Sequence, residues 1–271
     1  MRVNTTNERF AIYLPSLNGG GAERAMLNLA HGLGQGGCPV DLVLARAEGP
    51  YLANVRESIR VVDLKASRAL ASLPGLVRYL RRERPKALLS ALDYTNITAL
   101  WARRIAGVPS KAIVNEQNTI SQSATNSARR RQRLVPRLAR RFYPWADEIV
   151  AVSKGVANDL SRVIRFPEER IRVIFNPVVT PELTQKAKKP VDHPWLKSGQ
   201  PPVALAIGRL TEQKDFPTLI RAFARVQGRL RSRLMILGGG PDRPMLEKLV
   251  HELDLQDKVA LPGFVPNPYA Y

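Results

Sequence analysis

Short runs of aliphatic and β-branched residues recur along the first part of the chain, and segments with helical spacing separate them. Such nearly continuous apolar runs, alternating with helices, are typical of a parallel sheet that is covered on both faces. The helical spacing is clearest over 22–33, where apolar residues recur every three or four positions. The runs are 10–14, 40–45, 59–64, 87–90, 112–114, 148–152 and 171–175. The pattern therefore predicts an α/β domain over 1–180.

The alternation breaks after residue 177, and a stretch with five prolines among lysines and other polar residues follows. This composition predicts a linker over 181–201. Strands are then predicted at 203–207, 234–237 and 259–261, with helices around 216–226 and 245–253. We expect a second parallel-sheet domain over 202–271. We expect it to be incomplete, because three strands are too few for an open sheet to cover its helices.

The chain has 42 Lys and Arg residues and 23 Asp and Glu residues, which gives a net charge of +19. This positive charge favours the binding of anionic partners. A nucleic-acid-binding protein is one alternative that fits this charge, but no recognisable module for reading nucleic acid is present. Cys38 is the single cysteine, and the three histidines show no metal-ligand spacing. No apolar run approaches the ~18 residues of a membrane span. We expect a cytoplasmic protein that needs neither a metal nor a cofactor.

The first predicted strand leads into three consecutive glycines, Gly19, Gly20 and Gly21, and then into a helix. Glycines at a strand-to-helix turn let backbone N–H groups approach an anionic or hydroxyl-rich ligand at the positive end of the helix. The sequence matches neither G-x-G-x-x-G nor a Walker loop. A plain tight turn is the alternative interpretation.

The second domain also has glycine turns at the carboxyl ends of its first two predicted strands, where open α/β sheets bind ligands. An arginine and a lysine in that place suit a diphosphate, the arginine through a bidentate fork and the lysine as a point charge. The alternative is that both are solvated surface charges. The candidate residues are Gly208, Arg209 and Lys214 after the first strand, and Gly238, Gly239 and Gly240 after the second.

Several segments, taken together and in this order, resemble glycosyltransferase family 4. They are SLNGGGAER (16–24), VIFNP (173–177), AIGRL (206–210) with KDF (214–216), LGGGP (237–241) and LPGF (261–264). The resemblance implies a GT-B fold of two Rossmann-like domains, with the acceptor mainly on the first and a nucleoside-diphosphate sugar on the second. It also implies transfer with retention at the anomeric carbon. The segment NEQNT (115–119) resembles members that build surface polysaccharides and lipid-linked oligosaccharides, so a glycan or lipid-linked acceptor is expected.

The resemblance also implies roles for the candidate residues. Arg209 and Lys214 would bind the diphosphate and act in catalysis, since no Asp-x-Asp metal motif is present. The glycines of both domains and Asn118 would bind substrate. Many members have a histidine in the loop 116–118, where this chain has none. The family's paired glutamates would follow the region 263–264, so we expect little transfer from the 271 residues. An inactive remnant of such an enzyme is therefore a further alternative.

A run of arginines without acidic residues predicts a basic amphipathic helix that ends in aromatic residues. Such a helix is suited to an anionic membrane surface. The alternative is a solvated helix face whose apolar side packs on the sheet. The arginines are Arg129, Arg130, Arg131, Arg133, Arg137, Arg140 and Arg141.

Overall fold

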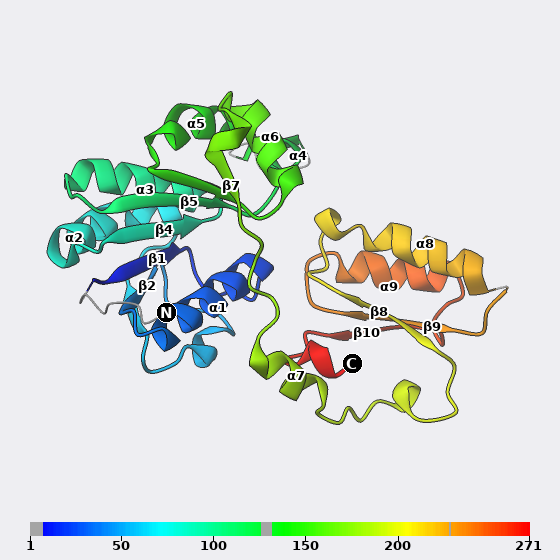
Figure 1. Ribbon diagram of the computed structural model, residues 1–271. Coiled ribbons are helices and arrows are strands. Elements are labelled where there is room, and N and C mark those ends of the chain that lie inside the picture. Colours follow the sequence, from blue (N-terminus) through cyan, green and yellow to red (C-terminus); the bar gives the residue numbers. More distant parts are fainter. Residues whose placement is uncertain (1–7, 126–131, 228) are drawn as a thin grey trace. The chain divides into compact units, whose positions relative to one another are not determined.

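A computed structural model describes residues 8–125, 132–227 and 229–271 of the chain (Figure 1). The chain forms two compact units, Met1–Val178 and Val179–Tyr271. Each unit contains one parallel sheet with helices packed on it. The predicted α/β class is therefore confirmed.

The first unit is built on a seven-stranded parallel sheet with the order β3-β2-β1-β4-β5-β6-β7. The strands are β1 (Phe10–Leu14), β2 (Val40–Leu44), β3 (Arg60–Asp63), β4 (Ala87–Ala91), β5 (Lys111–Glu116), β6 (Glu148–Ala151) and β7 (Ile171–Val173). The helices are α1 (Gly21–Gln35), α2 (Leu73–Glu83), α3 (Asp93–Ala106), α4 (Ile120–Thr125), α5 (Val135–Phe142) and α6 (Lys154–Ile164). All seven predicted strands are present, with ends that differ by a few residues.

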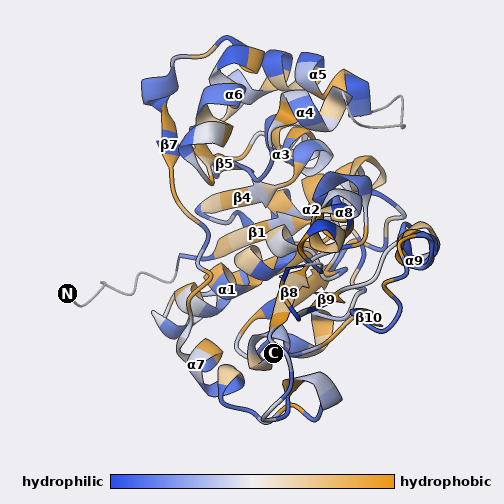
Figure 2. Cartoon of the chain, turned by 90° about the vertical axis from the view of Figure 1, so that its right-hand side faces the viewer, coloured by the Kyte–Doolittle hydropathy of each residue, from blue (hydrophilic) through white to orange (hydrophobic). Residues whose placement is uncertain are grey.

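Burial on both faces explains why the central strands are almost continuously apolar. Ile12 of β1 belongs to a core with Met26 of α1, whereas the next residue, Tyr13, belongs to a different core with Leu80 of α2. Successive side chains of a strand point to opposite faces, so β1 needs apolar residues at both sets of positions. Figure 2 shows the resulting hydrophobic colour along β1 and β4. Each fully buried large aliphatic side chain contributes about 1.5–3 kcal/mol to folding.

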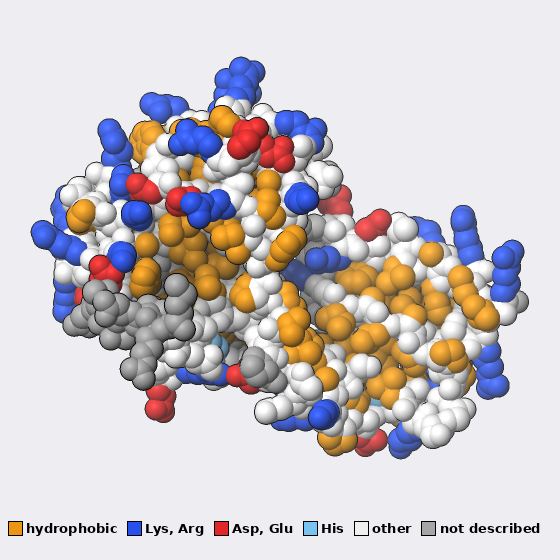
Figure 3. Space-filling model, viewed as in Figure 1, with side chains coloured by type: hydrophobic (Ala, Val, Ile, Leu, Met, Phe, Trp, Pro, Cys, Tyr) orange, Lys and Arg blue, Asp and Glu red, His pale blue; other side chains and the backbone are white. Residues whose placement is uncertain are grey.

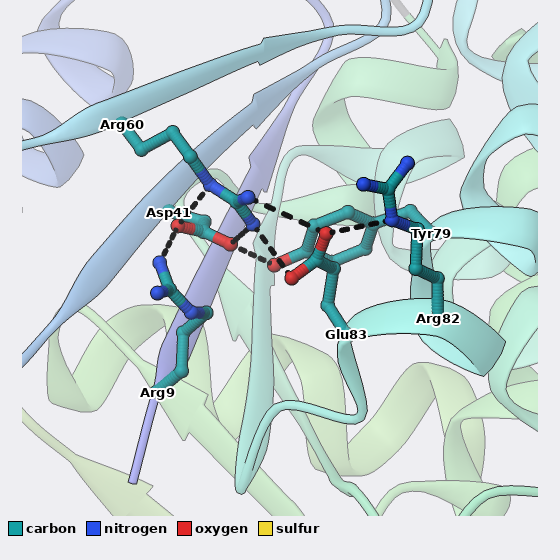
Figure 4. A network of polar contacts seen from close by, with 6 residues as sticks. All are labelled: Arg9, Asp41, Arg60, Tyr79, Arg82 and Glu83. Atoms are coloured by element: carbon teal, nitrogen blue, oxygen red, sulfur yellow. Dashed lines mark hydrogen bonds and ion pairs between the residues drawn. The ribbon is translucent and has the colours of Figure 1, made fainter. Parts of the chain in front are cut away.

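The buried carboxylate of Asp41, near the amino-terminal end of β2, is the centre of a network of hydrogen bonds and ion pairs (Figure 4). Asp41 is fully buried and accepts hydrogen bonds from Arg60 Nε at 2.9 Å and from Tyr79 Oη at 2.7 Å. Arg9 adds an ion pair, and Glu83 pairs with Arg60 at 3.0 Å. Burial alone would raise the pKa of Asp41, but the hydrogen bonds from Arg60, Tyr79 and Arg9 outweigh it and hold this pKa below its usual range. The network stabilises the edge opposite the carboxyl ends of the strands.

The second unit has a three-stranded parallel sheet with the order β10-β9-β8. Its elements are α7 (Pro181–Ala187), β8 (Val203–Ile207), α8 (Phe216–Gln227), β9 (Arg233–Leu237), α9 (Arg243–Glu252) and β10 (Val259–Gly263). Helices α8 and α9 pack with β9 in one core, for example through Ile220, Ile236 and Leu246. The three predicted strands and the two helices between them are confirmed.

Two features of this unit were not predicted from the sequence: a helix in the predicted linker, and exposed apolar residues on an edge strand. Helix α7 lies within the stretch predicted as a linker, where Pro181 occupies an early helical position that tolerates proline. Strand β8 lies at the edge of the sheet and leaves Leu205 39% and Ile207 54% exposed. Hydrophobic side chains are visible over the second unit in Figure 3.

Candidate active site

The carboxyl ends of three adjacent strands bring candidate residues of the first unit to one edge of the sheet. Strands β1, β4 and β5 are parallel neighbours. The glycine turn follows β1, Asp93 follows β4, and Asn118 follows Glu116, the last residue of β5. This edge is where ligands bind in open parallel sheets.

The glycine turn after β1 is constrained differently at each position. Gly19 has φ +89°, and Tyr51 Oη donates a hydrogen bond of 3.2 Å to its carbonyl oxygen. A Cβ atom on Gly20 would overlap the carboxylate of Glu23, which is only 8% exposed in the first turn of α1. A Cβ atom on Gly21 would meet nothing within 4 Å. The turn therefore needs Gly19 for its backbone conformation and Gly20 to accommodate Glu23, whereas Gly21 is open.

The carboxylate of Glu23 affects whether the glycine turn after β1 can bind an anion, as the sequence predicted. An acidic side chain in the first turn interacts favourably with the positive end of the helix. Glu23 occupies that place in α1. A phosphate at the same helix end would meet this negative charge, so the turn suits hydroxyl groups better than the sequence alone indicated.

A pair of carboxyl groups at the ends of β4 and β5 was not identified from the sequence. Glu116 is fully buried, and its Oε2 accepts a hydrogen bond of 2.8 Å from Tyr143 Oη. Burial, and after it the charge of Asp93, raises the pKa of Glu116 to about 8. Burial likewise raises the pKa of Asp93. The available signal was the position of Glu116 directly at the end of an apolar strand.

The loop after β5 is bound on its other side to the segment after β7. Gln117 and Asn176 form a reciprocal amide pair, with Asn176 Nδ2 donating to Gln117 Oε1 at 2.8 Å and Gln117 Nε2 donating to Asn176 Oδ1 at 3.3 Å. Asn28 of α1 donates to the carbonyl oxygen of Pro177 at 2.8 Å. These bonds bring together the segments NEQNT (115–119) and VIFNP (173–177), and they connect the latter with α1, the helix that follows the glycine turn.

In the second unit, the two glycine turns lie against each other. A Cβ atom on Gly238 would overlap the carbonyl oxygen of Gly208, and one on Gly240 would overlap that of Leu210. Gly238 also has φ +141°. A Cβ atom on Gly239 would meet nothing within 4 Å. Packing by itself therefore requires glycine at positions 238 and 240. A substitution at Gly239 does not disturb this packing, so it can test whether a ligand approaches the backbone.

The two predicted diphosphate ligands lie beside these turns. Arg209 directly follows Gly208, and both Arg209 and Lys214 are exposed. The aliphatic stem of Lys214 runs beside Gly208, since a Cβ atom there would lie 3.5 Å from Lys214 Cγ. The two cations are therefore near the carboxyl end of β8. The described residues contain no cluster of His, Cys, Asp and Glu that could hold a metal ion.

The arginine segment differs in part from the predicted surface helix. Arg129, Arg130 and Arg131 lie outside the described residues. Tyr143 is fully buried, and Phe142 packs edge-to-face on Trp101 and on Trp145, so these aromatic residues belong to the core. The arginines of this segment that the structure describes are all exposed: Arg133, Arg137, Arg140 and Arg141. Figure 3 shows Lys and Arg side chains projecting from the surface around α5 and α6.

Two parallel-sheet units with glycine turns at the carboxyl ends of their strands match the two Rossmann-like domains of the GT-B fold. A match to Glycosyltransferase Family 4 spans residues 19–181, and one to Glycosyl transferases group 1 spans residues 188–271. The chain belongs to glycosyltransferase family 4.

Two of the curated relatives are named as glycosyltransferases that act on a diphospho-undecaprenol-linked sugar and in lipopolysaccharide core biosynthesis. The chain is 34% identical over 185 residues to N-acetylgalactosamine-N,N'-diacetylbacillosaminyl-diphospho-undecaprenol 4-alpha-N-acetylgalactosaminyltransferase of Campylobacter jejuni, covering 66% of this chain and 47% of that protein. It is 28% identical over 251 residues to lipopolysaccharide core biosynthesis glycosyltransferase LpsE of Rhizobium meliloti, covering 90% and 64%. The chain thus spans about half to two thirds of the length of these relatives.

A solved structure has a similar fold. HepE of Anabaena in complex with UDP-glucose superposes with a TM-score of 0.72 at 16% identity, over 97% of this chain and 70% of that protein. At this level of identity the likeness concerns the fold. It agrees with the GT-B architecture that the sequence motifs implied.

Proposed function

We propose that the protein transfers a sugar from a nucleoside-diphosphate sugar to a hydroxyl group of a glycan or lipid-linked acceptor. The observation that carries this proposal is the pairing of glycine turns with Arg209 and Lys214 at the carboxyl end of β8, in a member of this family. The names of the relatives, which act in lipid-linked oligosaccharide and lipopolysaccharide synthesis, support this acceptor class. They favour the transferase over a nucleic-acid-binding protein.

The chemical demand of this reaction is the stabilisation of a departing diphosphate. Negative charge grows on the diphosphate as the bond to the sugar breaks, and cations fixed beside it stabilise that charge. Arg209 and Lys214 take this role in the proposal, Arg209 as a fork and Lys214 as a point charge. No cofactor is required for it. Retention at the anomeric carbon is proposed from the family pattern.

The acceptor is assigned to the first unit. The edge formed by Gly21, Asn118 and the amide of Gln117 offers hydroxyl-binding groups, and the carboxylate of Glu23 makes this edge less suited to phosphate. The acceptor's sugar hydroxyls would therefore contact this edge. Asn118 and Gly21 are the residues placed against it.

A lipid-linked acceptor also requires contact with a membrane surface. No helix in the described part of the chain is long and apolar enough to cross a bilayer. We assign peripheral attachment to the exposed arginines of α5 and its surroundings, because each cation near an anionic surface contributes about 1 kcal/mol. Since Phe142 and Tyr143 pack in the core, this attachment is electrostatic and does not depend on aromatic insertion.

A transfer assay tests the proposal. The protein in its full native length is incubated with a panel of radiolabelled nucleoside-diphosphate sugars and with undecaprenyl-diphosphate-linked or free glycan acceptors. Transfer of label from one donor to the lipid-linked acceptor, lost when Arg209 or Lys214 is replaced by alanine, is the expected result. Binding to duplex or single-stranded nucleic acid that sugar nucleotides do not displace, with no transfer from any donor, would overturn it.

A further inference from the structure

The segment that follows β2 is bonded to the glycine turn of the first unit. The backbone N–H of Leu17 donates to the carbonyl oxygen of Glu48 at 2.9 Å, and that of Tyr51 donates to the carbonyl oxygen of Leu17 at 3.3 Å. Gly49 has φ +110°, and a Cβ atom on it would overlap the backbone of Leu17. Tyr51 is only 9% exposed, and its hydroxyl group donates to the carbonyl oxygen of Gly19. The ring of Tyr51 is therefore fixed beside the glycine turn.

The guanidinium group of Arg24 stacks on this ring. Arg24 Cζ lies over the ring of Tyr51, 5.0 Å from its centroid. The backbone N–H of Arg24 donates to the carbonyl oxygen of Gly20 at 3.1 Å, so the residue belongs to the start of α1. Stacking uses the face of the planar guanidinium group and leaves its N–H donors directed outward in the plane. The side chain is partly exposed, so a cation with oriented donors is held at this edge of the sheet.

The preceding residue determines where along this edge an anion can bind. Glu23 is 8% exposed, and its carboxylate lies beside Gly20 at the positive end of α1. An anion at the helix end would meet this negative charge, whereas an anion at Arg24 would meet a cation. The glycine turn follows β1 and Asn118 follows β5, two strand spacings or about 10 Å away. A ligand extended along this edge can therefore contact both Asn118 and Arg24.

We propose that Arg24, held on the ring of Tyr51, binds an anionic group of the acceptor, either a phosphate or a carboxylate. The guanidinium group suits both, because its parallel N–H donors match two oxygens of either group. Arg24 is then a specificity-determining residue, and acceptors that carry the anionic group bind more tightly than neutral ones. This inference rests on the proposed function, in which the first unit binds the acceptor. It adds a charged contact to the hydroxyl contacts assigned to Gly21 and Asn118.

Nitrogen NMR of the chain labelled in its arginine side chains tests anion binding without any transfer reaction. The Nε–H signal of Arg24 is identified by its absence from Arg24→Lys. It should shift, and saturate, when inorganic phosphate or glucuronate is added, and it should not shift with glucose. The control is the signal of Arg46, which pairs with Glu48 at 3.0 Å in the segment after β2. If Arg24 responds to neither anion more than Arg46 does, the proposal is refuted.

Acceptor kinetics with the protein at its full native length identify the anionic group. The acceptors compared are a diphosphate-linked glycan, a glycan that contains a uronate, and a neutral glycan. Arg24→Gln should raise KM ~10–100-fold for the acceptor that carries the recognised group, the range expected for hydrogen bonds to a charged group. The KM for the neutral acceptor and for the donor should change little, and Arg46→Gln should change none of them. An equal rise for all three acceptors, a rise for the donor alone, or no rise at all would overturn the assignment.

Two further measurements separate recognition from support of the fold and from the proposed function. Arg24→Lys keeps the charge without the planar fork, so it should restore only part of the preference for the charged acceptor. The Arg24 variants should unfold at nearly the same urea concentration as the unmodified chain, because the side chain is partly exposed. A large loss of stability in both variants would assign Arg24 to the fold and overturn the proposal. Absence of transfer even in the unmodified protein would count against the proposed function, and the NMR shifts would still decide whether Arg24 binds an anion.

Discussion

Gly238 lies against Gly208 so closely that a Cβ atom on Gly238 would overlap the carbonyl oxygen of Gly208. The same residue has φ +141°, which side chains rarely adopt. Gly238→Ala should therefore lower the free energy of unfolding of the second unit by about 2 kcal/mol or more. Gly239→Ala is the matched control, because a Cβ atom there meets nothing within 4 Å. Urea unfolding of the two variants would measure the difference, and equal midpoints would contradict this packing.

A substitution at Gly239 can distinguish an effect on ligand binding from an effect on folding, because a Cβ atom there meets nothing within 4 Å. Gly239→Ala should leave thermal stability nearly unchanged and yet weaken binding of a nucleoside diphosphate, if the ligand approaches the backbone there. Gly21→Ala offers the corresponding test for the first unit, with the acceptor in place of the nucleotide. Isothermal calorimetry on folded variants is the measurement. Unchanged nucleotide affinity in Gly239→Ala would assign the glycine turn of the second unit to packing alone.

The predictability of these features depends on whether they are local in sequence. The strands were predictable because burial on both faces leaves nearly continuous apolar runs, as in β1, where the last four of the five residues are buried. The contact of Gly238 with Gly208 was not, because it depends on the register of two strands separated by a helix. Nor was the group of Asp93, Glu116 and Tyr143, which comes from three separate segments. Tyr143 also lies among arginines, a context that predicted a membrane surface and conceals its burial.

The charge on Asp41 should stabilise the first unit at neutral pH. Its pKa is lowered, so the stabilisation is complete above the ordinary carboxyl pKa of about 4 and is lost as pH falls below it. Asp41→Asn should lower the free energy of unfolding by about 2 kcal/mol at neutral pH. This value is smaller than for a fully buried ion pair, because the side chains of Arg9 and Arg60 are 35% and 43% exposed. Glu48→Gln, which removes an exposed pair with Arg46, is the control. Urea unfolding against pH should show the two chains converging in acid. A constant difference would argue against the linkage.

In the protein at its full native length, replacing Arg209 or Lys214 by alanine should lower kcat far more than it weakens binding of the sugar nucleotide. A cation aimed at the diphosphate stabilises the charge that develops as the bond breaks, and loss of one such group typically costs ~10²–10³ in rate. Arg221→Ala, an exposed change on α8, should have little effect. Steady-state kinetics with the donor varied would measure this. Near-normal kcat in both variants would remove these residues from the proposed mechanism.

The exposed arginines around α5 should attach the protein to anionic membranes. Replacing four of them by glutamine should lower the fraction that sediments with anionic vesicles, since each contributes about 1 kcal/mol. The test set is Arg133, Arg137, Arg140 and Arg141, and the control set, also exposed, is Arg221, Arg225, Arg229 and Arg231. Added salt should weaken the binding, because the interaction is electrostatic. Equal binding to neutral and anionic vesicles, or equal loss in both sets, would contradict this assignment.

The stability of Glu116→Gln, relative to that of the unmodified chain, should rise with pH. The pKa of Glu116 is raised from 4.5 to about 8, so between these values the folded chain binds a proton that the unfolded chain has lost. The free energy of unfolding of the unmodified chain must therefore fall with pH in this window, by at most about 1.4 kcal/mol per pH unit, and level off above about pH 8. Glutamine carries no such proton, so the variant should lack this fall. Urea unfolding of the unmodified chain, Glu116→Gln and the control Glu148→Gln, which removes a pair with Arg172 in neighbouring strands, from about pH 5 to about pH 9 would measure it. The curve of Glu116→Gln should diverge upward from the other two. Three parallel curves would contradict the raised pKa of Glu116.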